Sequence, residues 1–442
     1  MVFFGEGTLI IKWISAYDGG AVSPVLPELS GPITCNFSNK DYDICSMNGP
    51  ALLDPMTSTF FTMIPTPTNI MTTAPSDHLA EVKIRPYPRK TDKSAMSKAK
   101  ELTLVTSSNP PKSSSCGIMH SSPALIFSVG GYTGNFFHQF NEGFIPLYLT
   151  IHSFFPDRDV ILVITDLKDW WAKKYADLFP HLTSHPIINM DNQTTTHCFP
   201  SSIVGLIKHG HLVIDPELLP YPKTTLLDFN TFLRNALGGD DDEHGTGRVL
   251  ESYYNKPADQ KRRRPRLVLV NRKGGVGREI SNLVQVLNAI EEVGFQVIVF
   301  EPKRDAPVGD AYKLLQSSEA MLAVHGAAMT HLLLLRPGMV LGEIVPIGTD
   351  WLSKTFYEKP AKALGLEYIK YKVSFQESSL ADKYQPSDLV IKDPPGFTSG
   401  NWIKARVYMK TQNVKLDIPR FKKLFLEEAY DKAKRLLGLK ES

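Results

Sequence analysis

Residues 266–300 read RLVLVNRKGGVGREISNLVQVLNAIEEVGFQVIVF, and this stretch determines the fold class. Its two ends, 266–271 and 295–300, are short runs of mostly branched apolar residues, which are typical of buried strands. Between them, Glu279–Val293 carries apolar side chains at helical spacing, and Gly294 follows as a helix C-cap. A strand, a helix and a second strand of these lengths predict a βαβ unit in a parallel sheet.

The same alternation continues on both sides of this stretch. Further strands are predicted at 124–129, 159–165, 321–326, 339–346 and 366–373. Further helices are predicted at 136–151, 169–179, 310–317, 352–364 and 418–437, the last with Pro419 near its start. The pattern indicates an α/β protein with two doubly wound halves, whose ligands bind at the carboxyl ends of the strands.

The domain organisation follows from the length of 442 residues, which predicts two or three domains. Residues 1–110 are rich in Pro, Ser and Thr and predict an irregular, stem-like segment with a few short strands. The two α/β domains are expected at 111–245 and 266–415. A surface linker at 246–265 separates them, in a region with an acidic glycine run and a basic KRRRP run. The C-terminal helix occupies 416–442.

The composition is that of an ordinary globular protein, with 42% hydrophobic and 21% charged residues. A formal net charge of only +3 argues against an obligate nucleic-acid binder. The longest apolar run, 320–335, contains His325 and His331, so no transmembrane helix is predicted. The N-terminal MVFFGEGTLIIKWISA is a poor match to a signal peptide or an anchor.

The first candidate motif is SVGGYTGNFFHQFNEG at 128–143, where a strand ends in two glycines and a helix follows. His138, Gln139 and Glu142 lie on or near one face of that helix. A His and a Glu one turn apart can act as a base and its orienting group for a hydroxyl proton. The alternative is an ordinary glycine turn before a capped helix.

The second candidate motif is NRKGGVGREISN at 271–282. Arg272, Lys273 and Arg278 surround glycines where a helix is predicted to begin, a combination that suits a diphosphate. The alternative is a basic surface turn.

The third and fourth candidates follow later strands. His325 and Gly326 end a buried strand, where Gly326 permits close approach of a phosphate and His325 can donate to it. A structural histidine is the alternative. Glu343 lies inside another strand and could accept ribose hydroxyls or pair with Arg336.

Four cysteines and two glycosylation sequons complete the set of candidates. Cys35 and Cys45 flank a polar loop and are either a disulfide or two free thiols. No zinc-binding spacing is present among the four cysteines, which include Cys116 and Cys198. The sequons lie at Asn36 and Asn192.

Taken in order, several motifs resemble those of glycosyltransferase family 61, in particular its plant xylan-modifying branch. The matching segments are CNFSNKDYDIC, GGYTGNFFHQFNEGFIPLYLT, RLVLVNR with GREISN, AVHGAAMTHLLLLRPG, ESSLADKY and VKLDIPRF. They span roughly residues 31 to 430, which is nearly the whole chain.

The resemblance implies a fold and an activity. The family is expected to adopt the GT-B fold, two Rossmann-like domains facing a cleft. Its plant members transfer a pentose, arabinofuranose or xylose, from a UDP-sugar to xylan with inversion and commonly without a bound metal. The implied location is the Golgi lumen as a type II membrane protein, with Golgi glycosyltransferase complexes as possible partners. Because no anchor is found here, membrane attachment would need a segment absent from this sequence.

The resemblance also implies residue roles. Arg272, Arg278 and His325 would hold the UDP diphosphate, and Gly326 and Ala327 would supply backbone groups, with Glu343 also assigned to the donor site. The acceptor cleft would be lined by Asn135, Gln139 and Asn141, with Glu142 or His138 as the base. Family members often have an acid where Gln139 stands, so Glu142 is the acid that remains. A Golgi location also implies a Cys35–Cys45 disulfide and glycans on Asn36 and Asn192.

Two other functions stay open from the sequence. One is transfer of N-acetylglucosamine onto protein O-glycans, as in animal relatives of the family. The other is a catalytically silent relative that binds glycans, which the Gln at position 139 keeps open.

Overall fold

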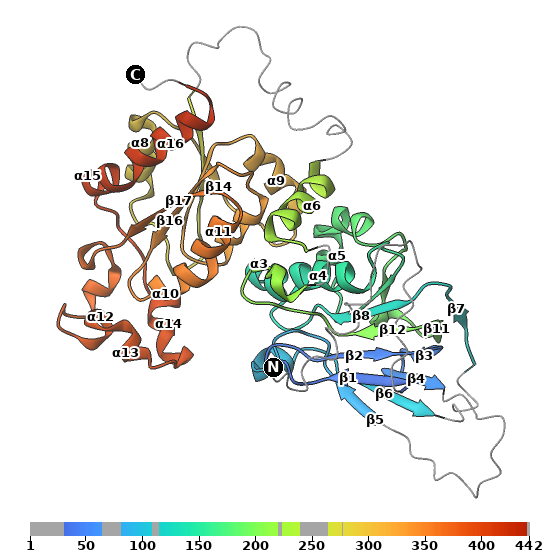
Figure 1. Cartoon of the computed structure of the whole chain (residues 1–442). Coiled ribbons are helices and arrows are strands. Elements are labelled where there is room, and N and C mark those ends of the chain that lie inside the picture. The colour runs from blue at the N-terminus through green and yellow to red at the C-terminus, as the bar shows by residue number, and fades with distance from the viewer. Residues whose placement is uncertain are drawn as a thin grey trace, which may run out of the picture. The chain divides into compact units, whose positions relative to one another are not determined.

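The computed structural model describes residues 31–63, 81–107, 115–219, 223–238, 264–275 and 277–439. The chain divides into two compact units, Met1–Thr225 and Leu226–Ser442. Each unit combines sheets with helices (Figure 1), so the predicted α/β class is confirmed at this level. No helix in the described part of the chain is long and apolar enough to cross a membrane. The expected linker at 246–265 lies almost wholly outside the described residues.

The second unit is built on a five-stranded parallel sheet. Its strands, in spatial order, are β14 (Gln296–Phe300), β13 (Arg266–Val270), β15 (Ala320–Val324), β16 (Val340–Val345) and β17 (Glu367–Lys372). Every neighbouring pair is parallel. In chain order this is 2-1-3-4-5, a doubly wound arrangement that reverses direction between β13 and β15. Ligands of such sheets bind outside the carboxyl ends of the strands at that reversal.

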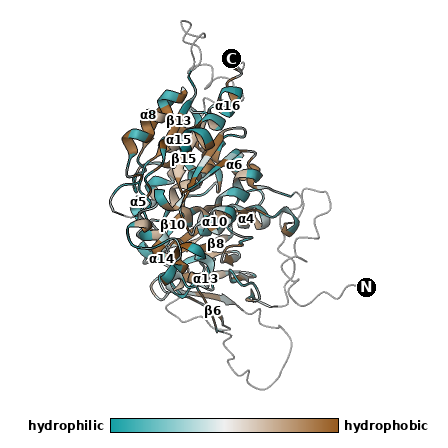
Figure 2. Cartoon of the chain, turned by 90° about the vertical axis from the view of Figure 1, so that its left-hand side faces the viewer, coloured by the Kyte–Doolittle hydropathy of each residue, from teal (hydrophilic) through white to brown (hydrophobic). Residues whose placement is uncertain are grey.

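Helices cover both faces of this sheet (Figure 1). On one face, Leu269 and Leu322 pack with α8 (Leu283–Val293) and with the C-terminal helical segment. Alternate strand residues such as Val268 and Met321 point the other way and are also fully buried. On that second side, α6 (Leu226–Gly238) and α9 (Val308–Gln316) pack together. Figure 2 shows that the outer helices, such as α16 (Glu427–Leu436), carry hydrophilic residues on the surface.

Two helices of this unit differ from the prediction. Helix α8 begins at Leu283, because residues before it run extended beside the C-terminal segment: Ile280 bridges Val414, and Ser281 N donates to Val414 O. The predicted helix 418–437 forms as α15 (Ile418–Phe421), a π-helical turn and α16. Gly294 caps α8 as expected, with a φ of 122°.

The first unit contains two six-stranded sheets. One has the order β1 (Ile33–Asn36), β2 (Ile44–Met47), β12 (Ser202–Val204), β8 (Ala124–Ser128), β9 (Ile161–Thr165) and β10 (Ile188–Asn189). The other has the order β5 (Glu81–Ile84), β6 (Leu102–Ser107), β4 (Thr59–Met63), β3 (Ala51–Asp54), β11 (His197–Phe199) and β7 (Ile118–Met119). In the first sheet, β12, β8, β9 and β10 are parallel, as a Rossmann-like core requires. The described residues between 33 and 107 thus contribute six strands, where the sequence predicted an irregular segment with a few short strands.

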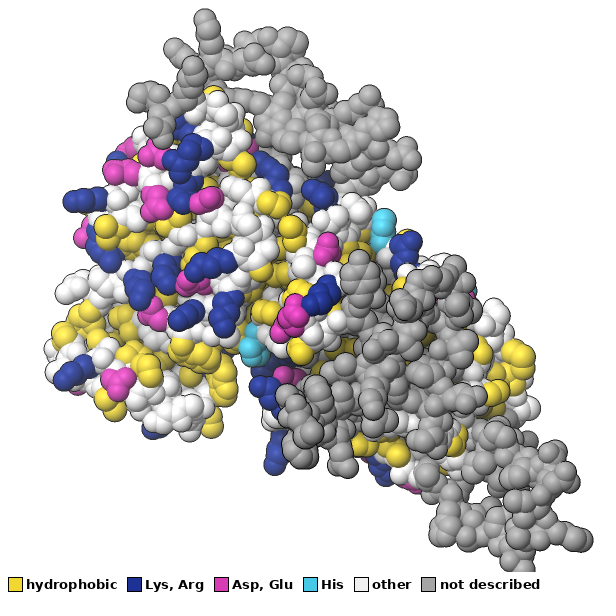
Figure 3. Space-filling view, in the orientation of Figure 1, with side chains coloured by type: hydrophobic (Ala, Val, Ile, Leu, Met, Phe, Trp, Pro, Cys, Tyr) yellow, Lys and Arg dark blue, Asp and Glu magenta, His cyan; other side chains and the backbone are white. Residues whose placement is uncertain are grey.

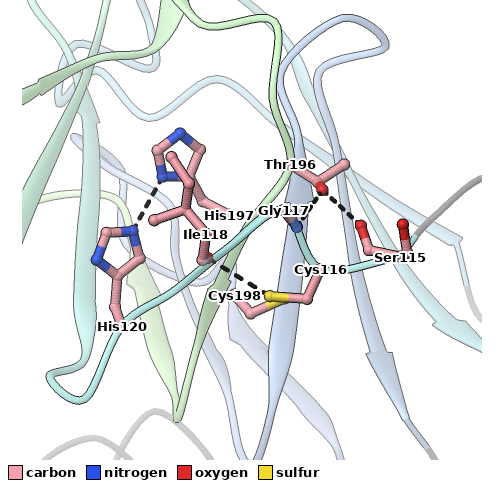
Figure 4. The surroundings of a disulfide bond; sticks show 8 residues. All are labelled: Ser115, Cys116, Gly117, Ile118, His120, Thr196, His197 and Cys198. Carbon is pink, nitrogen blue, oxygen red and sulfur yellow. Dashed lines mark hydrogen bonds between the residues drawn. A yellow bond between two sulfur atoms is a disulfide. The ribbon is translucent and has the colours of Figure 1, made fainter.

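Two disulfides fasten these sheets. Cys35 and Cys45 lie opposite each other on β1 and β2 and are joined. Cys116 and Cys198 form a second disulfide, which ties the segment before β7 to β11 (Figure 4). The sequence did not single out this second pair, because its members are 82 residues apart.

Candidate active site

The first group of candidate residues lies at the reversal of the parallel sheet in the second unit. Arg272 follows the end of β13 by two residues, and His325 comes directly after β15. Because β13 and β15 are neighbouring parallel strands, the topology places both residues at the same edge of the sheet. This is the edge where doubly wound proteins bind nucleotides.

Arg272 and Arg278 converge on Gly326. A methyl group on Gly326 would overlap with Arg272 Nη1 and lie 2.9 Å from Arg278 Nη1, so the two guanidinium groups would have to shift to admit it. The φ of 150° at this position also favours glycine. Arg278 Nη1 donates to the carbonyl of His325 at 2.9 Å. The backbone of Arg278 has a φ of 61°, a left-handed value that costs energy in a residue with a side chain and is concentrated at functional sites.

The two guanidinium groups form a buried positive centre. Burial lowers the pKa of both, and together with the charge of Arg272 it lowers the pKa of Arg278 to about 10. The Nε atoms of both arginines are buried without a hydrogen-bond partner in the described structure. Neither arginine forms an ion pair with a described residue. A site with this deficit of acceptors is suited to an anion that accepts from forked donors.

Glu343 holds His325 in place. His325 Nδ1 lies 2.6 Å from Glu343 Oε1, and the other carboxylate oxygen accepts from Ser353 Oγ at 2.9 Å and Tyr368 OH at 2.5 Å. Both carboxylate oxygens are therefore occupied by protein groups, and Glu343 is fully buried. Arg336, the alternative partner expected from the sequence, instead approaches Glu319. The carboxylate thus orients His325, in place of the ribose contact that the sequence suggested.

Two other expectations for this loop need correction. Lys273 is exposed and pairs with Glu301, with its Nζ 2.6 Å from Oε1. The glycine loop does not open directly into a helix, because α8 begins only at Leu283. The helical start near the arginines is instead the 3-10 helix Ala327–Leu334, which Gly326 precedes.

The second group of candidate residues lies in the first unit, after β8. The chain passes through Gly130 and Gly131 into α3 (Phe136–His138), a π-helical turn at Gln139–Phe144, and α4 (Ile145–Phe154). Gly131 has a φ of 57°, and a side chain there would overlap with the Tyr87 ring. π-Helical turns are rare and are frequent at functional sites. This one contains both Gln139 and Glu142.

Glu142 is the centre of a buried charge network. Its Oε1 accepts from Arg89 Nη1 at 2.9 Å and from Lys208 Nζ at 3.0 Å, and its Oε2 lies 2.8 Å from His138 Nδ1. Burial alone would raise the pKa of Glu142. The hydrogen bond from His138 and the charges of Lys208 and Arg89 outweigh it and lower the pKa to about 2. A carboxylate of this kind binds protons poorly, which suits an orienting group better than a base.

His138 is more accessible than Glu142. It lines a small pocket together with Gln139, Tyr132 and Trp171. Its ring centroid lies 4.7 Å from that of Tyr132, whose hydroxyl donates to Asp92. With Nδ1 bonded to Glu142, the imidazole presents Nε2 as the remaining proton acceptor.

The three residues expected in the acceptor cleft have identifiable contacts. Asn135 is exposed and caps α3 through its side chain, which accepts from Phe137 N. Gln139 is buried beside the pocket and accepts a hydrogen bond from Tyr175 OH. Asn141 is buried, accepts from Leu212 N at 2.8 Å and donates to Glu142. The structure therefore brings Gln139 to the pocket and gives Asn141 a supporting role.

Sequence reasoning missed the cationic partners of Glu142. Arg89 lies in a polar stretch that the sequence assigned to a loop, and Lys208 is 66 residues from Glu142. No local spacing pattern links these positions, so no sequence signal pointed to them. Among the described residues, no three His, Cys, Asp or Glu side chains gather in a way that could hold a metal ion.

The family model Glycosyltransferase 61 matches residues 136–342, a range that begins at α3 and ends in β16. The xylan glycosyltransferase MUCI21 of Arabidopsis thaliana is 37% identical over 418 residues, 93% of this chain and 82% of that protein. The chain belongs to glycosyltransferase family 61.

Two rice proteins extend the comparison. The alpha-1,3-arabinosyltransferase XAT3 of Oryza sativa subsp. japonica is 34% identical over 398 residues, 89% of this chain and 64% of that protein. The beta-1,2-xylosyltransferase XAX1 of the same species is 32% identical over 389 residues, with 87% and 64% coverage. The EGF domain-specific O-linked N-acetylglucosamine transferase of Pan troglodytes is more distant, at 24% over 284 residues. Membership of family 61 makes this chain a glycosyltransferase, which uses a nucleotide-sugar donor.

Proposed function

We propose that this protein is an inverting glycosyltransferase that moves a pentose, arabinofuranose or xylose, from a UDP-sugar to a hydroxyl of the xylan backbone. The observation that carries the proposal is the pair of buried guanidinium groups of Arg272 and Arg278 beside Gly326, at the reversal of a nucleotide-type sheet. Names of relatives at 32–37% identity, which mention xylan, arabinosyl and xylosyl transfer, supply the substrate class.

The donor is held by the second unit in this proposal. Arg272, Arg278 and the backbone at Gly326 and Ala327 bind the UDP diphosphate, and His325, whose Nδ1–H is held by Glu343, donates to it from Nε2 in its imidazolium form. As the bond between the anomeric carbon and the β-phosphate oxygen breaks, negative charge grows on UDP. Two fixed guanidinium groups in a site shielded from water stabilise that charge. The proposal requires no metal ion, and a chelator tests this point directly.

The acceptor is activated by the first unit. His138 Nε2 takes the proton of the xylan hydroxyl, and the oxygen attacks the anomeric carbon from the side opposite UDP. Glu142 holds Nδ1–H and stabilises the imidazolium that forms, as the acid does in other His–carboxylate pairs. This assigns the base to His138 and makes Glu142 its positioning residue. The proposal includes the GT-B fold for this chain, with the acceptor domain first in the sequence.

The protein is proposed to work in the Golgi lumen. Both disulfides, Cys35–Cys45 and Cys116–Cys198, support a compartment that is oxidising. Asn192 is exposed and suits a glycan, whereas Asn36 is half-buried and its side chain accepts from Ser38. Golgi glycosyltransferase complexes, as partners, belong to the same proposal.

The test is mass-spectrometric detection of transfer onto xylo-oligosaccharides. UDP-arabinofuranose, UDP-xylose and UDP-N-acetylglucosamine are offered in separate reactions, each with and without a chelator. Addition of one pentose from one donor, unchanged by the chelator, is the expected result. Addition of N-acetylglucosamine alone would instead favour an N-acetylglucosaminyltransferase that acts on protein O-glycans. UDP binding without any transfer would favour a silent glycan-binding relative.

A further inference from the structure

Two tryptophans of the second unit are exposed side by side. Trp351 is 47% exposed and Trp402 is 57% exposed. Their ring centroids are 5.8 Å apart with the planes at 54°, and the Phe356 ring lies 6.2 Å from Trp351. We call Trp351, Phe356 and Trp402 the aromatic platform. Figure 3 shows hydrophobic surface gathered over this part of the unit, around α10 (Asp350–Ser353) and α14 (Trp402–Lys410).

The two tryptophans of the platform lie at the N-terminal ends of two short helices. Trp351 lies in the first turn of α10, and Trp402 opens α14. The Asn401 side chain caps α14 by accepting from Ile403 N at 2.8 Å and from Lys404 N. Helix α14 buries Ala405 and Tyr408 while leaving Trp402 outside. Contiguous exposed apolar patches mark interaction sites, whereas single exposed apolar side chains are normal on protein surfaces.

Both helices are tied to the candidate donor site. Ser353 of α10 donates to Glu343, the carboxylate that holds His325. Gln412, just after α14, accepts from Arg278 N with its backbone carbonyl. Its side chain also bonds both backbone groups of Ile347, shortly before α10. The platform therefore lies on the same edge of the sheet as Arg278 and His325.

We propose that the aromatic platform is a binding subsite for the xylan chain, in which pyranose rings stack their C–H faces on the two indoles. The inference rests on the proposed function, which supplies a neutral glycan as the occupant. Two ring planes tilted by 54° suit successive sugars of a twisted chain better than one flat ring. An exposed ion pair, Asp350 with Lys372, borders Trp351 and offers partners for sugar hydroxyls.

The test is calorimetric binding of xylohexaose to the full chain carrying Trp351→Ala, Trp402→Ala or both. The double variant is expected to bind xylohexaose about tenfold or more weakly, because each lost stacking contact lowers affinity. Its affinity for UDP should match the wild type. Trp402→Phe, which keeps a stacking ring, should restore much of the binding. Val284→Ala removes an apolar side chain that is even more exposed, at 70%, elsewhere in the unit and serves as the control.

Other outcomes separate this inference from the proposed function. If the wild type transfers pentose but the double variant binds xylohexaose equally well, the inference fails alone. If the wild type binds xylohexaose through the platform but transfers nothing, the proposed activity fails and the subsite stands. If the double variant changes the oligomeric state in size-exclusion chromatography and leaves glycan binding unchanged, the platform is a protein interface and the inference is overturned. A double variant that loses UDP affinity as well is misfolded. Xylohexaose binding by the single variants and by Trp402→Phe then decides whether the aromatic platform binds the glycan.

Discussion

At the scale of single residues, Glu142 shows how a buried acid is kept ionised by its surroundings. It is fully buried, yet Arg89, Lys208 and His138 all contact it. Removing one member of a buried ion pair leaves an uncompensated charge, which costs more than the pair itself contributes. Glu142 thus supports the fold of the first unit as well as the orientation of His138.

The variant Glu142→Gln tests the structural part of this role. We expect it to lower the free energy of unfolding by about 3–5 kcal/mol, because Lys208 would remain buried without its counter-charge. Since the folded pKa is lowered from 4.5 to about 2, the carboxylate stabilises the protein above pH 4.5, and that stabilisation is lost as pH falls towards 2. Chemical denaturation of wild type and variant across this range measures both effects. Glu217→Gln, which breaks an exposed pair with Lys223, is the control and should change stability by less than about 1 kcal/mol. Equal loss in both variants, or equal acid sensitivity of wild type and Glu142→Gln, would contradict the charge network.

His138→Ala tests the chemical part. We expect transfer to fall by about 10²–10⁴-fold, the usual contribution of a general base. UDP affinity should hardly change, because His138 lies in the other unit from the arginines. Stability should fall less than in Glu142→Gln, because Arg89 and Lys208 still balance the charge of Glu142. Steady-state rates, thermal unfolding and UDP calorimetry on one preparation separate these effects. Transfer close to the wild-type rate would remove His138 from the mechanism.

Arg278→Ala tests the donor site. We expect UDP affinity to fall by about tenfold to a hundredfold, since a hydrogen bond to a charged group contributes about 1.5–3 kcal/mol. Lys273→Ala is the matched control from the same loop: it removes a positive charge that is exposed and paired with Glu301, so affinity should be nearly unchanged. Isothermal calorimetry with UDP measures both variants. Equal losses would mean that net charge of the loop, and not the buried pair, attracts UDP.

At the scale of elements, the parallel sheet of the second unit was predictable, with the bounds of its strands shifted by only a few residues. Its strands are apolar runs such as 266–270 and 340–345, bounded by glycine and charged residues, and sheets buried on both faces produce this pattern. The same reasoning predicted a binding role for Arg272, Arg278 and His325, because each comes after a predicted strand. The strands between residues 33 and 107 were predicted only as a few short strands without bounds, since they are short and lie in a stretch rich in Pro, Ser and Thr.

The contacts that complete the candidate site depend on tertiary structure. The start of α8 shifted because Ile280 and Ser281 pair with Val414, more than a hundred residues away. Glu343 was assigned to ribose because a sequence does not show that Ser353 and Tyr368 occupy its oxygens. Helical spacing likewise gave no sign of the π-helical turn around Glu142.

The disulfides of the first unit give a prediction at this scale. In the chain-entropy treatment, a loop of 82 residues contributes about 4–5 kcal/mol and a loop of 10 residues about 3 kcal/mol. Replacing Cys116 and Cys198 together by Ala should therefore destabilise the protein more than replacing Cys35 and Cys45. Unfolding by denaturant under non-reducing conditions compares the two double variants. The reverse order would show that packing around β1 and β2 dominates over the chain constraint.

At the scale of the whole molecule, family 61 chemistry requires two substrates with different demands. A nucleotide-sugar needs fixed cations, and we propose Arg272 and Arg278 of the second unit for this role. A neutral glycan hydroxyl needs a proton acceptor, and we propose His138 of the first unit for this role. The two clusters lie in separate compact units, so the donor diphosphate and the reacting acceptor hydroxyl should contact different units.

Hydrogen–deuterium exchange of the full chain tests this division of labour. UDP alone should slow amide exchange in the segments 271–282 and 325–334, because binding to the folded state suppresses local opening of the loops that hold it. The π-helical turn at 139–144 should exchange as before. Addition of xylohexaose should then protect the first unit near His138, and also α10 and α14 if the aromatic platform binds the chain. Protection by UDP confined to 139–144 would place the donor in the first unit and reverse the proposed roles of the two units.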